Sequence, residues 1–286
     1  MLTPTPPKPG SFSRKAALWG GVLAVAAIYL FATRPAPLAD EQSTGRMMPI
    51  EKVFRILAGE NDTVRALWTA DIVGAGMKAG LKFDEKWREP GVAAGPLPAL
   101  FLRESATALH KTRVPLGLFL GSDYPIAQSN LFTGAQAAHF ERMRATGNPE
   151  FFHAADIGRY TAMFADLAVA PGCVTCHNEH ANSPKTDWKL KDIMGATTWS
   201  YPKGQVTLEE AVEIMAALRS GFAAAYDGYL AKAATFERPP AIGERWPRED
   251  YAVPTRDVFM REFARRASSN TVERLLRAFD EPAPSN

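Results

Sequence analysis

Residues 171–180 read PGCVTCHNEH, and strand-type sequence lies on both sides of this segment. Before it, residues 151–169 contain two β-type stretches separated by Asp156-Ile157-Gly158. After it, the run ATTWSY at 196–201 is a strand candidate that Pro202 closes. A further strand candidate, VPLGLFL at 114–120, lies earlier in the chain. The Pro-Gly pair at the start of the 171–180 segment predicts that the two cysteines lie in a tight turn between strands of one small sheet.

Helical patterns surround this central β-type region. Apolar residues recur at a spacing of three or four over 49–78, where Asn61-Asp62 either interrupts the helix or caps a second one. Residues 98–110 and 135–145 also read as helices. Capping-box patterns at 207–210 and 270–273 predict a helix from Thr207 to about Thr235 and two short helices at the C-terminus. The expected fold class is therefore α+β.

Composition excludes several classes of protein. The chain has 286 residues, of which 46% are hydrophobic and 22% are charged, as in ordinary globular domains. A formal charge of +2 gives no basic field of the kind that binds nucleic acid. Two cysteines in a chain of this length do not make a disulfide scaffold.

The N-terminus contains an apolar segment, AALWGGVLAVAAIYLFA, at 16–32. As a helix it would span roughly 26 Å, enough for the hydrocarbon core of a membrane. Because Lys8, Arg14 and Lys15 precede it, we expect the first fifteen residues in the cytoplasm and the main domain in the periplasm, with a single pass through the inner membrane. The alternative is a cleaved signal peptide, which also sends the main domain across the membrane.

The pentapeptide from Cys173 to His177 has the C-x-x-C-H pattern of covalent haem attachment. Two thiols at this spacing can each add to one vinyl group of a haem. The imidazole of His177 then reaches the iron as the proximal ligand. The pattern predicts one covalently attached haem c, bound by Cys173 and Cys176, with His177 on the iron.

Three other interpretations of the same residues stay open. The two thiols, His177 and His180 could together bind zinc, although all four fall within eight residues. The two cysteines could instead form a redox-active dithiol or a plain disulfide.

The second iron ligand cannot be read from the sequence. Met163, Met194 and His110 are candidates, although buried methionines usually fill cores and His110 ends a helix. Tyr160, Trp188 and Trp199 are candidate pocket walls, with an ordinary core role as the alternative for each.

Several stretches resemble one protein family. They are EPGVAAGPLPALFLRESATAL at 89–109, PLGLFLGSDYPIAQSN at 115–130, and GCVTCHNEH followed by DWKLKDIMGATTWSYP within 172–202. These residues are similar to the bacterial haem-c PAS-like sensor domain family, a domain of unknown function often found ahead of histidine kinases or adenylate cyclases. The resemblance implies a PAS-like small antiparallel sheet with flanking helices and a haem c bound on it.

The resemblance also implies sensing of redox state or of a small ligand such as a diatomic gas. It carries over to Cys173, Cys176 and His177 only. Some relatives use a cysteine thiolate as the distal ligand, but both cysteines of this chain belong to the motif. No output module follows Pro202, so a sensor of this kind would signal to a partner protein.

The resulting domain organisation follows the chain. It comprises a cytoplasmic tail (1–15), a transmembrane anchor (16–33), a linker (34–48), the PAS-like haem-c domain (49–205), an amphipathic helix (206–235), a Pro-rich linker (236–254), and C-terminal helices with a tail (255–286).

Two functions fit these features. The first is a membrane-anchored haem sensor that acts on a partner protein. The second is an anchored electron-transfer cytochrome c subunit of a respiratory or photosynthetic complex. We identify no acid–base pair near the motif, so we expect no enzyme activity and assign no catalytic residue.

Overall fold

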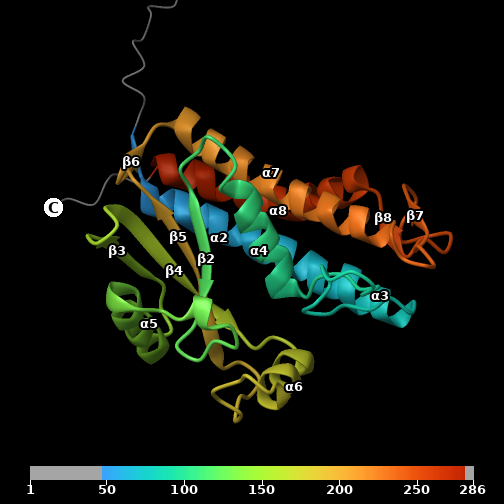
Figure 1. The fold of residues 1–286 in the computed structure, drawn as a ribbon. Coiled ribbons are helices and arrows are strands. Elements are labelled where there is room, and N and C mark those ends of the chain that lie inside the picture. The colour runs from blue at the N-terminus through green and yellow to red at the C-terminus, as the bar shows by residue number, and fades with distance from the viewer. Residues whose placement is uncertain (1–46, 281–286) are drawn as a thin grey trace, which may run out of the picture. The chain divides into compact units, whose positions relative to one another are not determined.

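The structure, a computed structural model, describes residues 47–280, and a four-stranded antiparallel sheet lies at its centre. The strands follow the spatial order β2-β5-β4-β3 (Figure 1). Their bounds are Gly117–Gly121 (β2), Glu150–Ala154 (β3), Arg159–Leu167 (β4) and Ile193–Tyr201 (β5). The ladder between β4 and β5 runs from Tyr160 opposite Tyr201 to Leu167 opposite Ile193. β4 and β5 are therefore the central strands.

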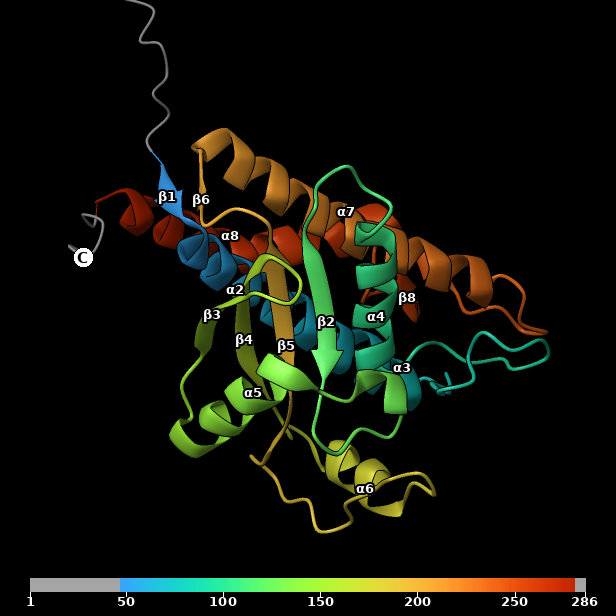
Figure 2. The same ribbon diagram turned by 60° about the vertical axis from the view of Figure 1, so that its left-hand side comes forward.

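Helices cover both faces of the sheet (Figure 2). The helical elements of residues 47–280, not all of which pack on the sheet, are α2 (Ile50–Leu67), the π-helical segment η1 (Trp68–Gly74), α3 (Ala75–Lys78), α4 (Pro98–Leu109), α5 (Gly134–Thr146), α6 (Pro171–Glu179), α7 (Leu208–Ala233) and α8 (Arg256–Asp280). The 3-10 turn η2 (Gln128–Asn130) follows β2. Short strand pairs join β1 (Met48–Pro49) to β6 (Gln205–Val206) and β7 (Ile242–Gly243) to β8 (Val253–Pro254). This arrangement confirms the expected mixture of an antiparallel sheet and flanking helices.

The two faces of the sheet have different cores. Ala162 and Trp199 pack in the main core with apolar residues of α2, α4, α7 and α8. Met163, the next residue of β4, packs on the opposite face with Phe140 and Met143 of α5. This alternation follows from the two-residue period of a strand.

Stacked aromatic rings join the helices of the main core. Trp68 stacks on Phe101 of α4 with 4.2 Å between ring centroids, and Tyr226 of α7 stacks on Phe259 of α8 at 4.0 Å.

The helix that the Thr207 capping box predicts is α7, and the Thr207 hydroxyl accepts a hydrogen bond from the Glu210 N–H at 3.2 Å. The sheet therefore lies between α5 on one face and the layer of α2, α4, α7 and α8 on the other.

Two local expectations are wrong. The first is that Asn61-Asp62 breaks the first helix, whereas α2 runs without interruption from Ile50 to Leu67. The second is that the C-terminus forms two short helices, whereas α8 is continuous from Arg256 to Asp280. The expected capping box at 270–273 lies inside this helix, where the Thr271 hydroxyl donates to Glu60 of α2 at 2.9 Å. Packing against α2 outweighs the local capping signal.

No helix within residues 47–280 is both long enough and apolar enough to cross a membrane. The anchor expected at 16–33 lies outside the described residues.

Candidate functional site

The C-x-x-C-H motif lies in the connection between the two central strands. Backbone hydrogen bonds close the base of this connection, from the Ala168 N–H to the Asp192 carbonyl and from the Lys191 N–H to the Ala168 carbonyl, each 3.0 Å long. Helix α6 stands beyond this base, at the end of the sheet (Figure 2). α6 is therefore linked through the chain to β4 on one side and to β5 on the other.

The motif forms a helix rather than the turn that the Pro-Gly pair predicts. Pro171 occupies the first turn of α6, where its missing N–H costs no hydrogen bond, and its ring presets the helical backbone. Cys173 and Cys176 lie three residues apart on this helix, which places both thiols on one face. The thiols are free, with Cys173 half-buried and Cys176 exposed.

His177 is half-buried, and its Nδ1 atom is buried without a hydrogen-bond partner. Burial, with a smaller contribution from nearby His180, lowers the pKa of His177 below its usual value. A neutral imidazole is the form that binds iron, so the histidine suits the role of an axial ligand. Burial also raises the pKa of the Cys176 thiol, with smaller contributions from Glu85, Cys173 and Glu179.

His180 has partners of its own. Its Nε2 lies 3.0 Å from Oε2 of Glu85, and its Nδ1 lies 3.1 Å from the Asn182 backbone nitrogen. Within residues 47–280, no three His, Cys, Asp or Glu side chains gather as ligands for one metal ion. The described residues thus do not form the donor set that the zinc interpretation requires.

Trp188 is buried beside α6 and is 4% exposed. The Asn178 side chain binds the backbone of Trp188 twice, donating to its carbonyl at 3.0 Å and accepting from its N–H at 2.8 Å. The indole Nε1 is buried with no partner. Asn178, the residue immediately after the motif, therefore holds the Trp188 backbone next to α6.

Exposed apolar side chains adjoin the base of the connection that carries α6. Leu167, Val169 and Leu190 are 40%, 68% and 53% exposed. Two of them precede α6 and one follows it, and the backbone bonds of Ala168 hold these segments side by side. An apolar macrocycle attached to α6 would cover surface of this kind. The free thiols, the unpartnered Nδ1 of His177 and these side chains all fit a haem.

A family comparison bears on the same region. The model of the Tll0287-like family matches residues 53–202, from α2 to the end of β5. The chain belongs to the Tll0287-like family. No curated protein and no solved structure matches the chain.

The other candidate residues of the Tll0287-like region differ in how near they lie to α6. Met194 lies at the start of β5, in an irregularity of the ladder, because Gly195 pairs with Asp166 while Ile193 pairs with Leu167. Its carbonyl accepts a hydrogen bond from the Ser122 hydroxyl at 2.6 Å. Met194 therefore lies at the end of the sheet that carries α6.

Four candidates lie elsewhere. Tyr160 is the second residue of β4, seven residues or about 23 Å before Leu167, and its ring contacts His153. Trp199 is fully buried in the main core, and Met163 is fully buried beneath α5. His110 is exposed at the C-terminal end of α4, where the chain turns back toward β2. The structure does not bring these four to α6.

Sequence reasoning missed three residues near the motif in the Tll0287-like region. They are Asn178, Glu85 and Arg65, which forms an ion pair with Asp166 and interacts electrostatically with Cys173. Asn178 is adjacent to the motif in sequence, but only its contact with Trp188 shows its role. Glu85 and Arg65 are distant in sequence, and no local pattern marks them.

Proposed function

We propose that this domain carries one covalently attached haem c. Cys173 and Cys176 would form the thioether bonds, and His177 would be the proximal iron ligand. The observation that carries this proposal is the half-buried His177, unpartnered at Nδ1, on the same helix as two free thiols. The family assignment is compatible with it. When bound, the haem supplies a redox-active iron that can also take a small ligand.

Residues around the motif would hold such a group. Helix α6 sets the spacing of the two thiols, and Asn178 fixes Trp188 behind the helix. Leu167, Val169 and Leu190 offer apolar cover. Of the three distal candidates, Met194 has the position that suits the role best.

The function we infer is sensing of redox state or of a small ligand through the haem iron. The support is the place of α6 in the connection between β4 and β5. A change on α6 would pass into the two central strands and then into the helices that pack on them. We propose that the sheet is PAS-like, that the domain signals to a partner protein, and that it is not an enzyme.

Membrane anchoring belongs to the same proposal. It rests on the apolar segment at 16–32 and on the basic residues that precede it. The domain would then lie in the periplasm, tethered to the inner membrane with its N-terminus in the cytoplasm.

The second candidate function is electron transfer within a respiratory or photosynthetic complex. Exposure of Cys176 at the end of the sheet favours it, because a haem attached there would have an edge near the surface. An exposed edge suits exchange of electrons with a docked partner.

Haem attachment is tested by producing the full chain in a host with a cytochrome c assembly system. After extraction with acid acetone, we expect haem to stay on the wild-type polypeptide and to be absent from Cys173→Ala/Cys176→Ala. His110→Ala is the matched control, because this histidine is remote from α6, and it should retain its haem. Haem that stays on the double variant would overturn the proposal.

Optical spectra of the oxidised, reduced and CO-treated protein separate the two functions. Bands that CO shifts at once indicate an open or labile distal site and support the sensor. Sharp reduced bands that CO leaves unchanged indicate two firm axial ligands and support the electron carrier.

A further inference from the structure

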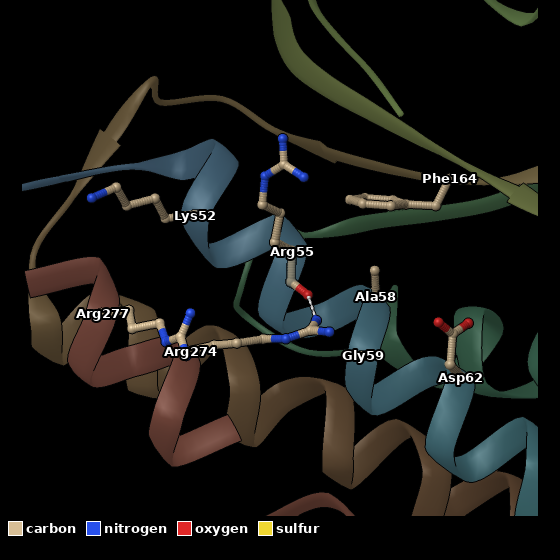
Figure 3. Close-up of a pocket in the computed structure, with 8 residues that line it drawn as sticks. All are labelled: Lys52, Arg55, Ala58, Gly59, Asp62, Phe164, Arg274 and Arg277. Carbon is tan, nitrogen blue, oxygen red and sulfur yellow. Dashed lines mark hydrogen bonds between the residues drawn. The ribbon is translucent and has the colours of Figure 1, made fainter. Parts of the chain in front are cut away.

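A groove rich in basic side chains lies between α2, α8 and β4, and no step of the proposed haem chemistry uses it. Its volume is about 410 Å³. Four of the lining residues are basic and one is acidic. The lining residues, drawn in Figure 3, are Lys52, Arg55, Ala58, Gly59, Asp62, Phe164, Arg274 and Arg277.

Arg274 of α8 lies across α2 at Gly59 (Figure 3). Its Nη1 donates to the Arg55 carbonyl at 2.5 Å. A Cβ atom at position 59 would lie only 2.6 Å from that Nη1. The glycine therefore makes the room in which this guanidinium rests, and the carbonyl holds it in place.

Arg55 has no carboxylate within ion-pair distance among the described residues. Its guanidinium instead lies 4.5 Å from the ring centroid of Phe151 on β3. Arg277 pairs with Glu273, one turn earlier on α8, at 2.6 Å. Asp62, the acidic residue of the lining, lies two turns beyond Arg55 on α2, about 10 Å along the helix axis. Asp62 interacts electrostatically with Arg274. The positive charge of the lining that has no carboxylate within ion-pair distance among the described residues is therefore that of Arg55.

We propose that this groove binds an anion that carries a phosphate group. Guanidinium groups held in fixed positions bind phosphate oxygens through paired, charge-assisted hydrogen bonds. The volume lies within the range of small-molecule sites, and Phe164 and Ala58 give apolar wall beside the charged end. The phosphate belongs either to a soluble compound or to the headgroup of an anionic phospholipid.

Pyrophosphate is the probe for the first experiment, which uses the full-length protein with its haem attached, in detergent, and isothermal titration calorimetry. We expect the dissociation constant to rise at least about tenfold in Arg55→Gln/Arg274→Gln. The control is Arg261→Gln/Arg265→Gln, which removes the same charge from α8 outside the groove, and it should bind as the wild type does.

Gly59→Ala is a second variant that changes no charge. The added methyl group would displace the Arg274 guanidinium, while alanine favours the helix itself. We expect this variant to fold and to bind pyrophosphate several-fold more weakly. A merely non-specific attraction to positive charge would leave its affinity unchanged.

Three results would overturn the proposal. The first is that pyrophosphate does not bind to the wild type, and the second is that the groove variant and its control bind it with equal affinity. The third is that pyrophosphate binds only to protein without attached haem, which would mean that the haem propionates fill the groove.

Nanodiscs identify the source of the phosphate. If phosphatidylglycerol, but not phosphatidylcholine, abolishes pyrophosphate binding to the wild type, the groove takes a lipid headgroup. Binding that persists in both kinds of disc assigns a soluble anion.

Discussion

Glu60 of α2 and Arg219 of α7 form an ion pair in which the two partners differ sharply in burial. The Glu60 side chain is 1% exposed and that of Arg219 is 37% exposed. Nε of Arg219 lies 3.0 Å from Oε2 of Glu60, and the Thr271 hydroxyl of α8 donates to Oε1 at 2.9 Å. One buried carboxylate therefore links three helices behind the sheet.

This asymmetry predicts unequal effects of removing either partner. Arg219→Met leaves a buried carboxylate without its cation and should lower the free energy of unfolding by about 3 kcal/mol. Glu60→Gln leaves an arginine that reaches solvent and should cost about 1–2 kcal/mol. Urea denaturation of both variants measures the difference. Equal losses, or a larger loss for Glu60→Gln, would contradict this account.

Glu262 of α8 should make the stability of the domain sensitive to acid. Hydrogen bonds from Arg265 and Arg266 lower the pKa of Glu262 to about 2 from an ordinary value of 4.5. A carboxyl whose pKa is lower in the folded state stabilises the fold above pH 4.5, and the contribution disappears as the pH falls toward 2.

Glu262→Gln should therefore be less stable than the wild type by about 1–2 kcal/mol at pH 7, after allowance for solvent screening. The two proteins should converge near pH 2. Glu273→Gln, which removes an exposed carboxylate of the same helix, is the control and should change stability by under about 0.5 kcal/mol. Denaturation curves at pH 7 and pH 3 test this prediction, and a gap that does not narrow at pH 3 would refute it.

Asn178 should hold the segment that follows the motif. Asn178→Ala removes both of its hydrogen bonds to the Trp188 backbone. We expect hydrogen exchange of the Trp188 amide to accelerate at least about tenfold, corresponding to about 1.4 kcal/mol. Asn182→Ala is the matched control, because that side chain is exposed. Unchanged exchange in Asn178→Ala would show that the segment is held by other contacts.

Met163 should not be an iron ligand. Its side chain is fully buried beneath α5, so Met163→Leu should leave the oxidised and reduced optical spectra of the haem protein unchanged. Met194→Leu is the parallel variant at the end of the sheet that carries α6, and a shifted spectrum there would assign the distal ligand. A spectral shift in Met163→Leu would contradict the packing described here.

The local elements could be predicted because each depends on neighbours in the chain. The Thr207 capping box marks the start of α7, and strand-type runs around Gly158 correspond to β3 and β4. The C-x-x-C-H spacing identifies the candidate haem residues without any knowledge of the fold. The type of a short connecting segment was less predictable, because Pro171–Glu179 was expected to form a turn and forms a helix.

The surroundings of the candidate site could not be predicted in the same way. Met163 and Met194 look alike in the sequence, yet one is enclosed by α5 and the other lies at an irregular strand end. Tyr160 and Trp199 are near the motif in sequence and are separated from it by the length of a strand. Distance along the chain is a poor guide here, because extended strands carry residues away from each other.

The sequence by itself determined the mixture of strands and helices, the C-x-x-C-H pentapeptide and the start of α7, all of which follow from short-range pattern. Only the tertiary structure decided that α8 is one helix, that Glu60 is buried against Arg219, and that Arg55 and Arg274 share a groove. These outcomes join residues far apart in the chain. Burial and charge pairing between such residues depend on how the helices pack, and no local pattern specifies that packing.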